Sequence, residues 1–148
     1  MSMGGSRAVG IGALILALLL AGAGTSVSSG WFHRTTGAPP TGTIHIRIHY
    51  SRFEPLEIDV EPGQTIRFVV ENTDPIDHEF IVGDEGVQQV HDAGSEAHHE
   101  PRPGEISIPA GETVTTTYTF PGRSGGLLFG CHLPGHYAYG MRGEISIG

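Results

Sequence analysis

From residue 43 onward, the chain contains many short segments in which apolar and polar residues alternate. The clearest is TIHIRIHY at 43–50, where every second residue from Ile44 to Tyr50 is apolar or aromatic. A period of two is typical of a strand with one buried face. We therefore expect one face of this strand to line a core, with Ile44, Ile46, Ile48 and Tyr50. His45 and His49 lie on the opposite face and are expected to be exposed.

Further strands are predicted at 56–60, 65–71, 79–82, 105–108, 114–120, 126–129 and 143–147. Between them lie turn signals such as Glu61-Pro62-Gly63 and Pro109-Ala110-Gly111. No segment after residue 40 has a convincing helical period, although 84–90 is a candidate for a short helix. Many short strands joined by Gly/Pro turns predict an all-β sandwich or barrel.

The N-terminal region predicts export. Arg7 precedes an uncharged apolar run that ends in Ala21-Gly22-Ala23, the order typical of a secretory signal peptide. Because about 20 apolar residues can span a bilayer, an uncleaved membrane anchor within 1–30 is the alternative. Residues 31–42, rich in Thr, Gly and Pro, are predicted to be a linker, which leaves 43–148 as the folded domain. We expect that domain to be periplasmic, extracellular or anchored to the outer face of the cytoplasmic membrane.

The charge of the chain argues against nucleic-acid binding. The formal net charge is −8, all 8 basic residues are Arg, and none is Lys. We find no basic patch that would neutralise phosphates. An acidic surface is compatible with a cationic redox partner but does not identify one.

The segment CHLPGHYAYGM contains the one cysteine of the chain. Four residues separate Cys131 from His136, and four more separate His136 from Met141. Thiolate and thioether are soft ligands, imidazole is intermediate, and two histidines with one cysteine and a distant methionine are typical of a blue-copper site. The spacing therefore predicts three of the four ligands of such a site.

We expect the remaining ligand to be His78, which opens a predicted strand after an Asn/Asp/Pro turn at 72–77. A ligand at the end of a strand can be fixed in space before copper arrives. Within the cysteine segment, Pro134-Gly135 predicts a tight turn. Gly140 lacks a side chain where the backbone would approach the metal.

Two other interpretations of Cys131 stay open at this point. A buried free cysteine is often inert, and a neighbouring histidine can activate a catalytic thiolate. The inert thiol leaves the spacing of His136 and Met141 unexplained. The catalytic pair leaves Met141 and His78 without a role.

Residues 43–148 resemble a cupredoxin, and the segments 131–143 and 72–80 resemble the copper loop and first-histidine segment of the rusticyanin and auracyanin type. The resemblance implies a Greek-key β-sandwich with one type 1 copper ion that alternates between Cu(I) and Cu(II). It also implies His78, Cys131, His136 and Met141 as the copper ligands.

Two neighbours of these ligands need separate interpretation. Glu79 occupies a position where many cupredoxins have Asn or Ser. If its carboxylate approached the thiolate it would lower the redox potential, whereas alternation along the strand would point it outward. We expect His132 to point away from copper and to be exposed or hydrogen-bonded.

The segment 83–104 contains three further histidines, His91, His98 and His99. Short His-rich segments bind metals, and Asp92, Glu96 or Glu100 could complete a second, weaker site. The alternative is a solvated acidic loop.

The leading functional prediction is an exported one-electron carrier that is not an enzyme. We expect it to be a monomer that makes transient contact with a cytochrome or a membrane oxidoreductase, with a membrane tether if the N-terminal segment is retained. The alternative is a copper-handling protein for storage, resistance or delivery, which would use the same site and the His-rich loop.

Overall fold

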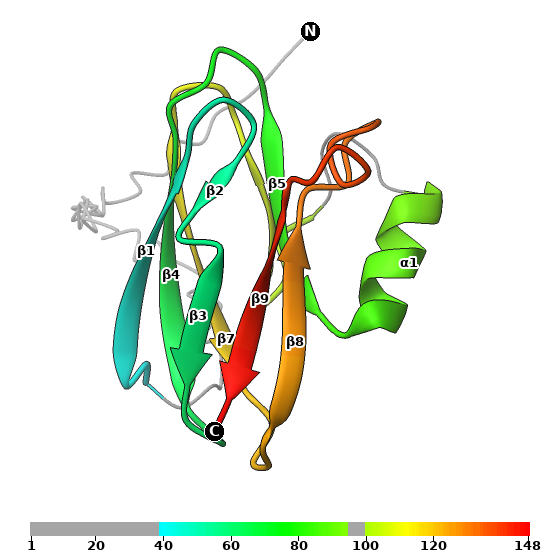
Figure 1. Cartoon of the computed structure of the whole chain (residues 1–148). Helices are drawn as coiled ribbons and strands as arrows, with labels where there is room; N and C mark the ends of the chain where they lie inside the picture. Colours follow the sequence, from blue (N-terminus) through cyan, green and yellow to red (C-terminus); the bar gives the residue numbers. More distant parts are fainter. Residues whose placement is uncertain (1–38, 95–99) are drawn as a thin grey trace, which may run out of the picture. The chain divides into compact units, whose positions relative to one another are not determined.

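The computed structural model describes residues 39–94 and 100–148, which form two β-sheets packed face to face and one helix beside them (Figure 1). The predicted signal or anchor segment 1–30 and the predicted linker up to residue 38 lie outside the described residues. Within the described ranges, no helix has the length and apolar character needed to cross a bilayer.

The first sheet has four strands in the order β2-β1-β4-β7. β1 and β4 pair in parallel, and the other pairs are antiparallel. The bounds are β1 Gly42–Ile48, β2 Phe53–Glu54, β4 Thr65–Asn72 and β7 Thr113–Thr119.

The second sheet has five strands in the order β3-β9-β8-β5-β6. β3 and β9 pair in parallel, and the remaining pairs are antiparallel. The bounds are β3 Glu57–Val60, β5 His78–Gly83, β6 Glu105–Ile108, β8 Gly125–Gly130 and β9 Arg142–Ile147. The predicted all-β Greek-key sandwich is thereby confirmed.

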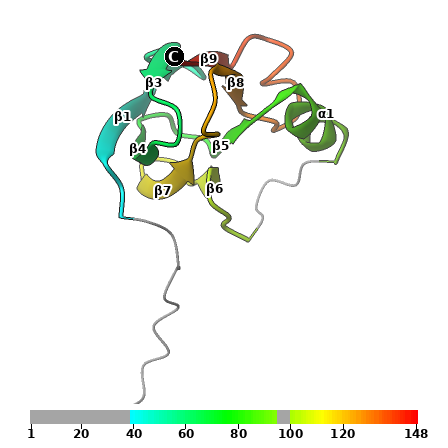
Figure 2. The ribbon, with the colours of Figure 1, turned by 90° about the horizontal axis from the view of Figure 1, so that it is seen from below.

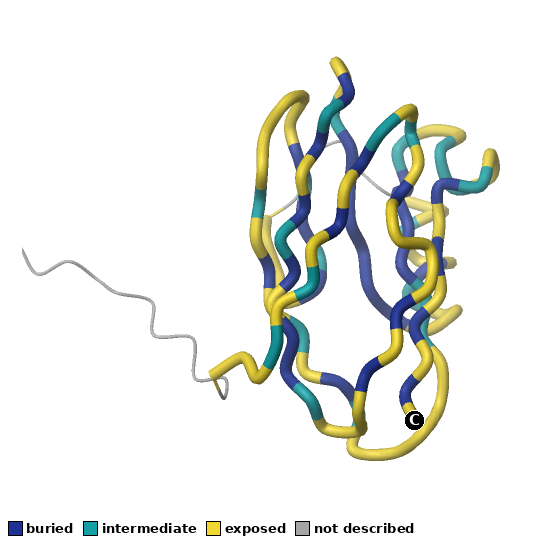
Figure 3. The backbone as a smooth tube through the Cα atoms, turned by 60° about the vertical axis from the view of Figure 1, so that its left-hand side comes forward, coloured by how far each residue is buried: buried dark blue, intermediate teal, exposed yellow. Residues whose placement is uncertain are grey.

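The core lies between the sheets, where inward-facing residues are buried and the alternate positions are exposed (Figure 3). At its centre lie Phe53, Phe68, Phe80 and Phe129, all at most 1% exposed. Their ring centroids are 5.2 Å apart for Phe68–Phe80 and 5.3 Å for Phe53–Phe129. Full burial of one such side chain stabilises the fold by about 1.5–3 kcal/mol, so these four rings are a major part of what holds the sheets together.

One predicted strand ends earlier than the alternation indicated. β1 ends at Ile48, and Tyr50 is 82% exposed instead of lining the core. Tyr50 and Ser51 both have φ of 52°, and His49 and Arg52 exchange two backbone hydrogen bonds across them. This tight hairpin leads into β2, which was not predicted because two residues are too short to show a period.

The helix α1 (Glu85–Gly94) is longer than the short helix predicted at 84–90. Asp84 is the N-cap of this helix, because its Oδ1 accepts a hydrogen bond from the backbone N–H of Val87 at 3.0 Å. The buried face of α1 packs against β5 and β8 (Figure 2). The helix therefore covers the second sheet next to β8, the strand that ends just before Cys131.

Gly143 provides a test of the core packing around Phe129. It pairs with Phe129 across β8 and β9, and a Cβ atom there would lie 2.2 Å from Phe129 Cζ and 2.5 Å from the carbonyl oxygen of Leu56. We expect Gly143→Ala to lower the free energy of unfolding of the metal-free protein by about 1–3 kcal/mol, because the core must shift to admit the methyl group.

The matched control is Gly126→Ala on β8, where a Cβ atom would meet nothing nearer than 3.8 Å. Urea unfolding of the two variants should separate them clearly. Equal free energies of unfolding would show that the core around Gly143 admits a methyl group without loss of stability.

Candidate metal centre

Three predicted ligands converge at one end of the sandwich. His78 begins β5, and Cys131 and His136 lie in the loop between β8 and β9. One donor atom from each residue lies within 4.8 Å of the others. Cys131 Sγ is 3.3 Å from His136 Nδ1 and 3.9 Å from His78 Nδ1.

These distances fit a metal ion held between the three side chains. Metal–nitrogen and metal–sulfur bonds of about 2.0–2.3 Å at trigonal angles place sulfur and nitrogen about 3.8 Å apart. A thiolate with two imidazoles is the donor set that copper prefers. His78 and Cys131 are both 0% exposed, whereas His136 is half-buried, so the centre reaches the surface through His136.

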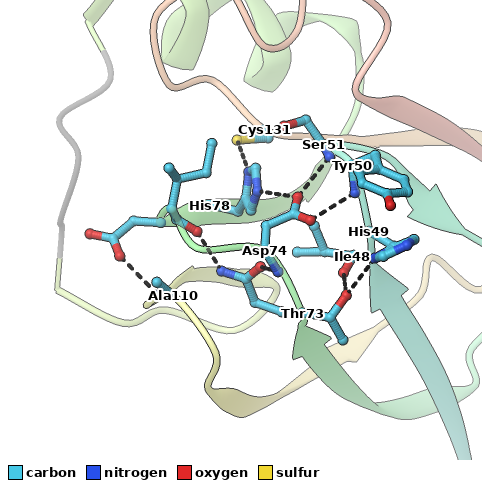
Figure 4. Close-up of polar contacts among 12 residues, drawn as sticks. Ile48, His49, Tyr50, Ser51, Thr73, Asp74, His78, Ala110 and Cys131 are labelled. Carbon is cyan, nitrogen blue, oxygen red and sulfur yellow. Dashed lines mark hydrogen bonds and ion pairs between the residues drawn. The ribbon is translucent and has the colours of Figure 1, made fainter.

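The orientation of His78 is set by Asp74. Its Nε2 lies 3.0 Å from Asp74 Oδ2, which turns Nδ1 toward Cys131 (Figure 4). Burial lowers the pKa of His78, although the hydrogen bond with Asp74 opposes this effect. The neutral imidazole therefore carries its proton on Nε2 and presents the lone pair of Nδ1 to the metal.

The Asp74 carboxylate is itself held by the β1–β2 hairpin. It accepts hydrogen bonds from the backbone N–H groups of Tyr50 and Ser51, both at 2.7 Å. Burial raises the pKa of Asp74, but the hydrogen bonds from Ser51, Tyr50 and His78 outweigh it and hold the pKa below its ordinary value. Non-glycine residues at positive φ are strained, and the two N–H bonds to Asp74 stabilise the hairpin in this form.

The loop that carries Cys131 and His136 is closed by backbone hydrogen bonds. The N–H of Cys131 donates to the carbonyl of Met141 at 3.1 Å, and the N–H of Met141 donates to the carbonyl of His136 at 3.0 Å. The predicted tight turn is confirmed, because His136 N–H donates to the carbonyl of Leu133 at 2.9 Å and Gly135 has φ of 86°.

Gly140 has a role in the backbone conformation of the loop. Its φ is 92°, a conformation that favours glycine. A Cβ atom at this position would meet only Arg52 Nη1, at 3.9 Å. The structure therefore gives a conformational reason for Gly140, and its predicted role near the metal stays a prediction.

The surroundings of Cys131 favour the protonated thiol. Burial raises the pKa of its thiol to about 11, although the backbone N–H of Glu79 donates to Sγ at 3.3 Å and opposes this effect. A catalytic thiolate requires a lowered pKa, and the direction of this shift does not favour the catalytic pair. A bound cation would supply the charge that stabilises the thiolate.

Glu79 is turned inward. Its side chain is fully buried, and Oε2 accepts a hydrogen bond from the backbone N–H of His132 at 3.2 Å. The outward orientation considered from alternation is therefore wrong. Through its N–H and its carboxylate, Glu79 contacts both Cys131 and the residue that follows it.

His132 is buried on the other side of the loop, beside α1. Its Nε2 lies 2.7 Å from Gln88 Oε1, and its ring stacks on Tyr137 with centroids 4.5 Å apart. Burial lowers the pKa of His132. The expectation of a hydrogen-bonded side chain outside the donor set agrees with this arrangement.

The structure gives less information on the ligand role of Met141 and on the predicted His-rich site. Met141 is 1% exposed and its backbone closes the ligand loop, but its role as axial ligand stays a prediction. Of the three histidines in the polar segment, only His91 lies in the described residues. Its Nε2 is 3.5 Å from Glu105 Oε2. His98 and His99 lie outside the described residues, as does Glu96.

Comparisons with known proteins agree with this centre. Residues 42–148 match the model of the family "Copper binding proteins, plastocyanin/azurin family". The copper-resistant cuproprotein CopI of Rubrivivax gelatinosus is 32% identical over 99 residues, which are 65% of this chain and 59% of that relative. The chain thus spans about three fifths of the length of this relative.

Solved structures of auracyanins are also similar. Auracyanin B has a TM-score of 0.63 at 20% identity, with 76% of this chain and 92% of that chain covered. A dithionite-reduced auracyanin from Roseiflexus castenholzii has a TM-score of 0.61 at 26% identity, with 74% and 99% covered. The first likeness shows the fold alone.

Asp74→Asn tests the support of His78. One carboxylate oxygen becomes an NH₂ group that faces the N–H donors of Tyr50, Ser51 or His78, so His78 loses its fixed orientation. We expect the affinity for copper to fall about 10–100-fold, as is usual when the partner of a ligating histidine is lost. Competition with a copper chelator measures this change.

The control is Asp77→Asn, which removes a charge from the same turn. Asp77 Oδ1 accepts from the N–H of Ala110 at 2.9 Å, and an amide oxygen can do the same. Similar affinities for the two variants would contradict a specific role of Asp74.

Alkylation of the metal-free protein tests the state of Cys131. A shift of the thiol pKa from 9.0 to about 11 lowers the thiolate fraction near neutral pH about a hundredfold. We expect the rate of reaction with iodoacetamide to be slow and to rise about tenfold per pH unit up to about pH 10. A rate that levels off near pH 8 would indicate an activated thiolate instead.

Proposed function

This chain belongs to the plastocyanin/azurin family of copper-binding proteins, and on that basis we propose that it is an exported one-electron carrier. The observation that supports this proposal best is the His78–Cys131–His136 set, whose donor atoms converge within 4.8 Å. Copper bound there supplies the one-electron change between Cu(I) and Cu(II). No substrate is transformed.

Hydrogen bonds from neighbouring groups of the chain hold the ligands in place. Asp74 holds the ring of His78, the N–H of Glu79 donates to the sulfur of Cys131, and the closed loop holds His136. Ligands held in this way keep the same positions in both oxidation states, which lowers the reorganisation needed for electron transfer. We propose that Met141 would be a further ligand of the copper ion, since its backbone is hydrogen-bonded to both Cys131 and His136.

The partner is proposed to dock over His136, which is the most exposed member of the donor set. Beside it in the loop lie the partly buried Leu133, the exposed Pro134 and Tyr139, which is 86% exposed. A small apolar surface of this kind suits a brief and weak encounter. We propose a cytochrome or a membrane oxidoreductase as the partner and a monomer as the working form.

Copper handling is the second candidate, and one observation favours it: the similar protein of Rubrivivax gelatinosus is named a copper-resistant cuproprotein. In this function the same three ligands would store or deliver copper. The two functions differ in what leaves the site, since a carrier releases an electron and keeps its copper, whereas a handling protein releases the ion.

An absorption spectrum and a chelator challenge together distinguish the two functions. We expect the oxidised, copper-loaded protein to show an intense visible thiolate-to-copper band, because the donor set contains one thiolate. Cys131→Ser should lose this band, whereas His45→Gln, at an exposed position of β1, should retain it. No band in the parent protein would contradict type 1 copper.

For a carrier, cycles of reduction and oxidation should leave the copper content unchanged in the presence of a competing chelator. Release of the copper to the chelator on reduction would instead favour handling.

A further inference from the structure

A second group of potential ligands lies beside α1 and has no role in the proposed copper centre. Its central member is His132, whose neighbour Gln88 is fixed by two carbonyl groups. Gln88 Nε2 lies 3.1 Å from the carbonyl oxygen of Ile81 and 3.4 Å from that of Leu128. Because carbonyls only accept hydrogen bonds, this nitrogen is the amide NH₂ group, and the amide oxygen faces His132.

This orientation of Gln88 determines the tautomer of His132. The Gln88 oxygen accepts from Nε2 at 2.7 Å, so the proton of the neutral ring lies on Nε2. Nδ1 is then a bare acceptor. It is buried and has no hydrogen-bond partner, on a side chain that is 0% exposed.

The charged group that faces Nδ1 is a second acceptor. Asp92 Oδ1 lies 3.7 Å from His132 Nδ1, beyond hydrogen-bond distance. Two acceptors that face each other are unfavourable unless a proton or a metal ion lies between them. Asp92 is exposed, so an ion can reach this position from solvent.

A second imidazole lies beside the same position. The ring centroids of His91 and His132 are 5.8 Å apart, compared with 5.1 Å for His78 and His136 at the copper centre. Two imidazoles bound to one ion have centroids about 5–6 Å apart, given metal–nitrogen bonds of about 2.0–2.1 Å. Both pairs therefore have a spacing that one ion can bridge.

The ring of His91 also has a carboxylate on one side, as the ring of His78 does at the copper centre. His91 Nε2 lies 3.5 Å from Glu105 Oε2, much as His78 Nε2 lies 3.0 Å from Asp74 Oδ2. A carboxylate behind the ring is the usual partner of a metal-binding histidine.

We propose that His91, Asp92 and His132 bind a second metal ion, a zinc or copper(II) ion, beside the copper centre. Two imidazole nitrogens and one carboxylate oxygen are ligands that both ions accept. Within residues 39–94 and 100–148, only the copper centre already has three such donor atoms within 4.8 Å of one another. Three donor atoms would therefore converge at the second site only after its side chains move around the ion.

This proposal does not depend on the function of the copper centre, but the two sites are linked by the peptide bond between Cys131 and His132. An ion on His132 Nδ1 adds positive charge one residue from the copper ligand Cys131. We therefore expect zinc binding to shift the visible absorption band of the oxidised copper protein.

The test is a calorimetric titration of the copper-loaded full chain with zinc chloride, because zinc is colourless and redox-inactive. We expect one additional zinc ion per chain. His91→Ala and Asp92→Asn should each weaken this binding at least about tenfold. His45→Ala, at an exposed position of β1, should leave it unchanged.

A second measurement identifies the bound atom without altering the copper loop. In the Cu(I)-loaded, diamagnetic protein, zinc should move the ¹⁵N chemical shift of His132 Nδ1 while Nε2 keeps its proton. The proposal is overturned if no additional zinc binds, which is the result expected if a proton fills the gap between Nδ1 and Asp92. It is also overturned if zinc binding survives His91→Ala but is lost when His98 and His99 are replaced by Ala.

Discussion

The copper centre depends on the hydrogen bonds of one carboxylate, that of Asp74. This group accepts from two backbone N–H groups of the β1–β2 hairpin and from the ring of His78. It thereby stabilises a hairpin with two residues at positive φ and directs Nδ1 of His78 toward Cys131. A single buried anion thus couples the conformation of a loop in the first sheet to the position of a ligand in the second.

The centre is formed where the chain passes from one sheet to the other. β4 belongs to the first sheet and β5 to the second, and the turn between them carries Asp74 and leads into His78, the first residue of β5. The β8–β9 loop brings Cys131 to the same end, where the N–H of Glu79 donates to its sulfur. The aromatic core fixes the distance between the sheets, so the donor atoms take their positions from the packing of the whole sandwich.

The sequence predicted most of the strands and the Cys131–His136 pair because both leave local patterns. Alternation marks strands such as β6, found at the predicted 105–108, and the spacing of Cys131 and His136 reflects a single loop. The roles of Asp74 and Gln88 were not predicted, because their partners lie 23–24 residues away for Asp74 in the β1–β2 hairpin and 44 residues away for Gln88 at His132. The inward turn of Glu79 likewise depends on a contact 53 residues away, with the backbone of His132.

The parallel pairing of β3 with β9 has a consequence for the order of events during folding. It joins residues 57–60 to residues 144–147, so the second sheet has no complete edge until β9 has been added. Contacts of such long sequence separation form late, because their loop-closure entropy must be overcome first. A chain that emerges N-terminus first therefore exposes His78 well before Cys131 and His136 arrive, and the pocket is completed only when the last strand docks. Copper can therefore be held by all of these ligands only after the last strand has docked.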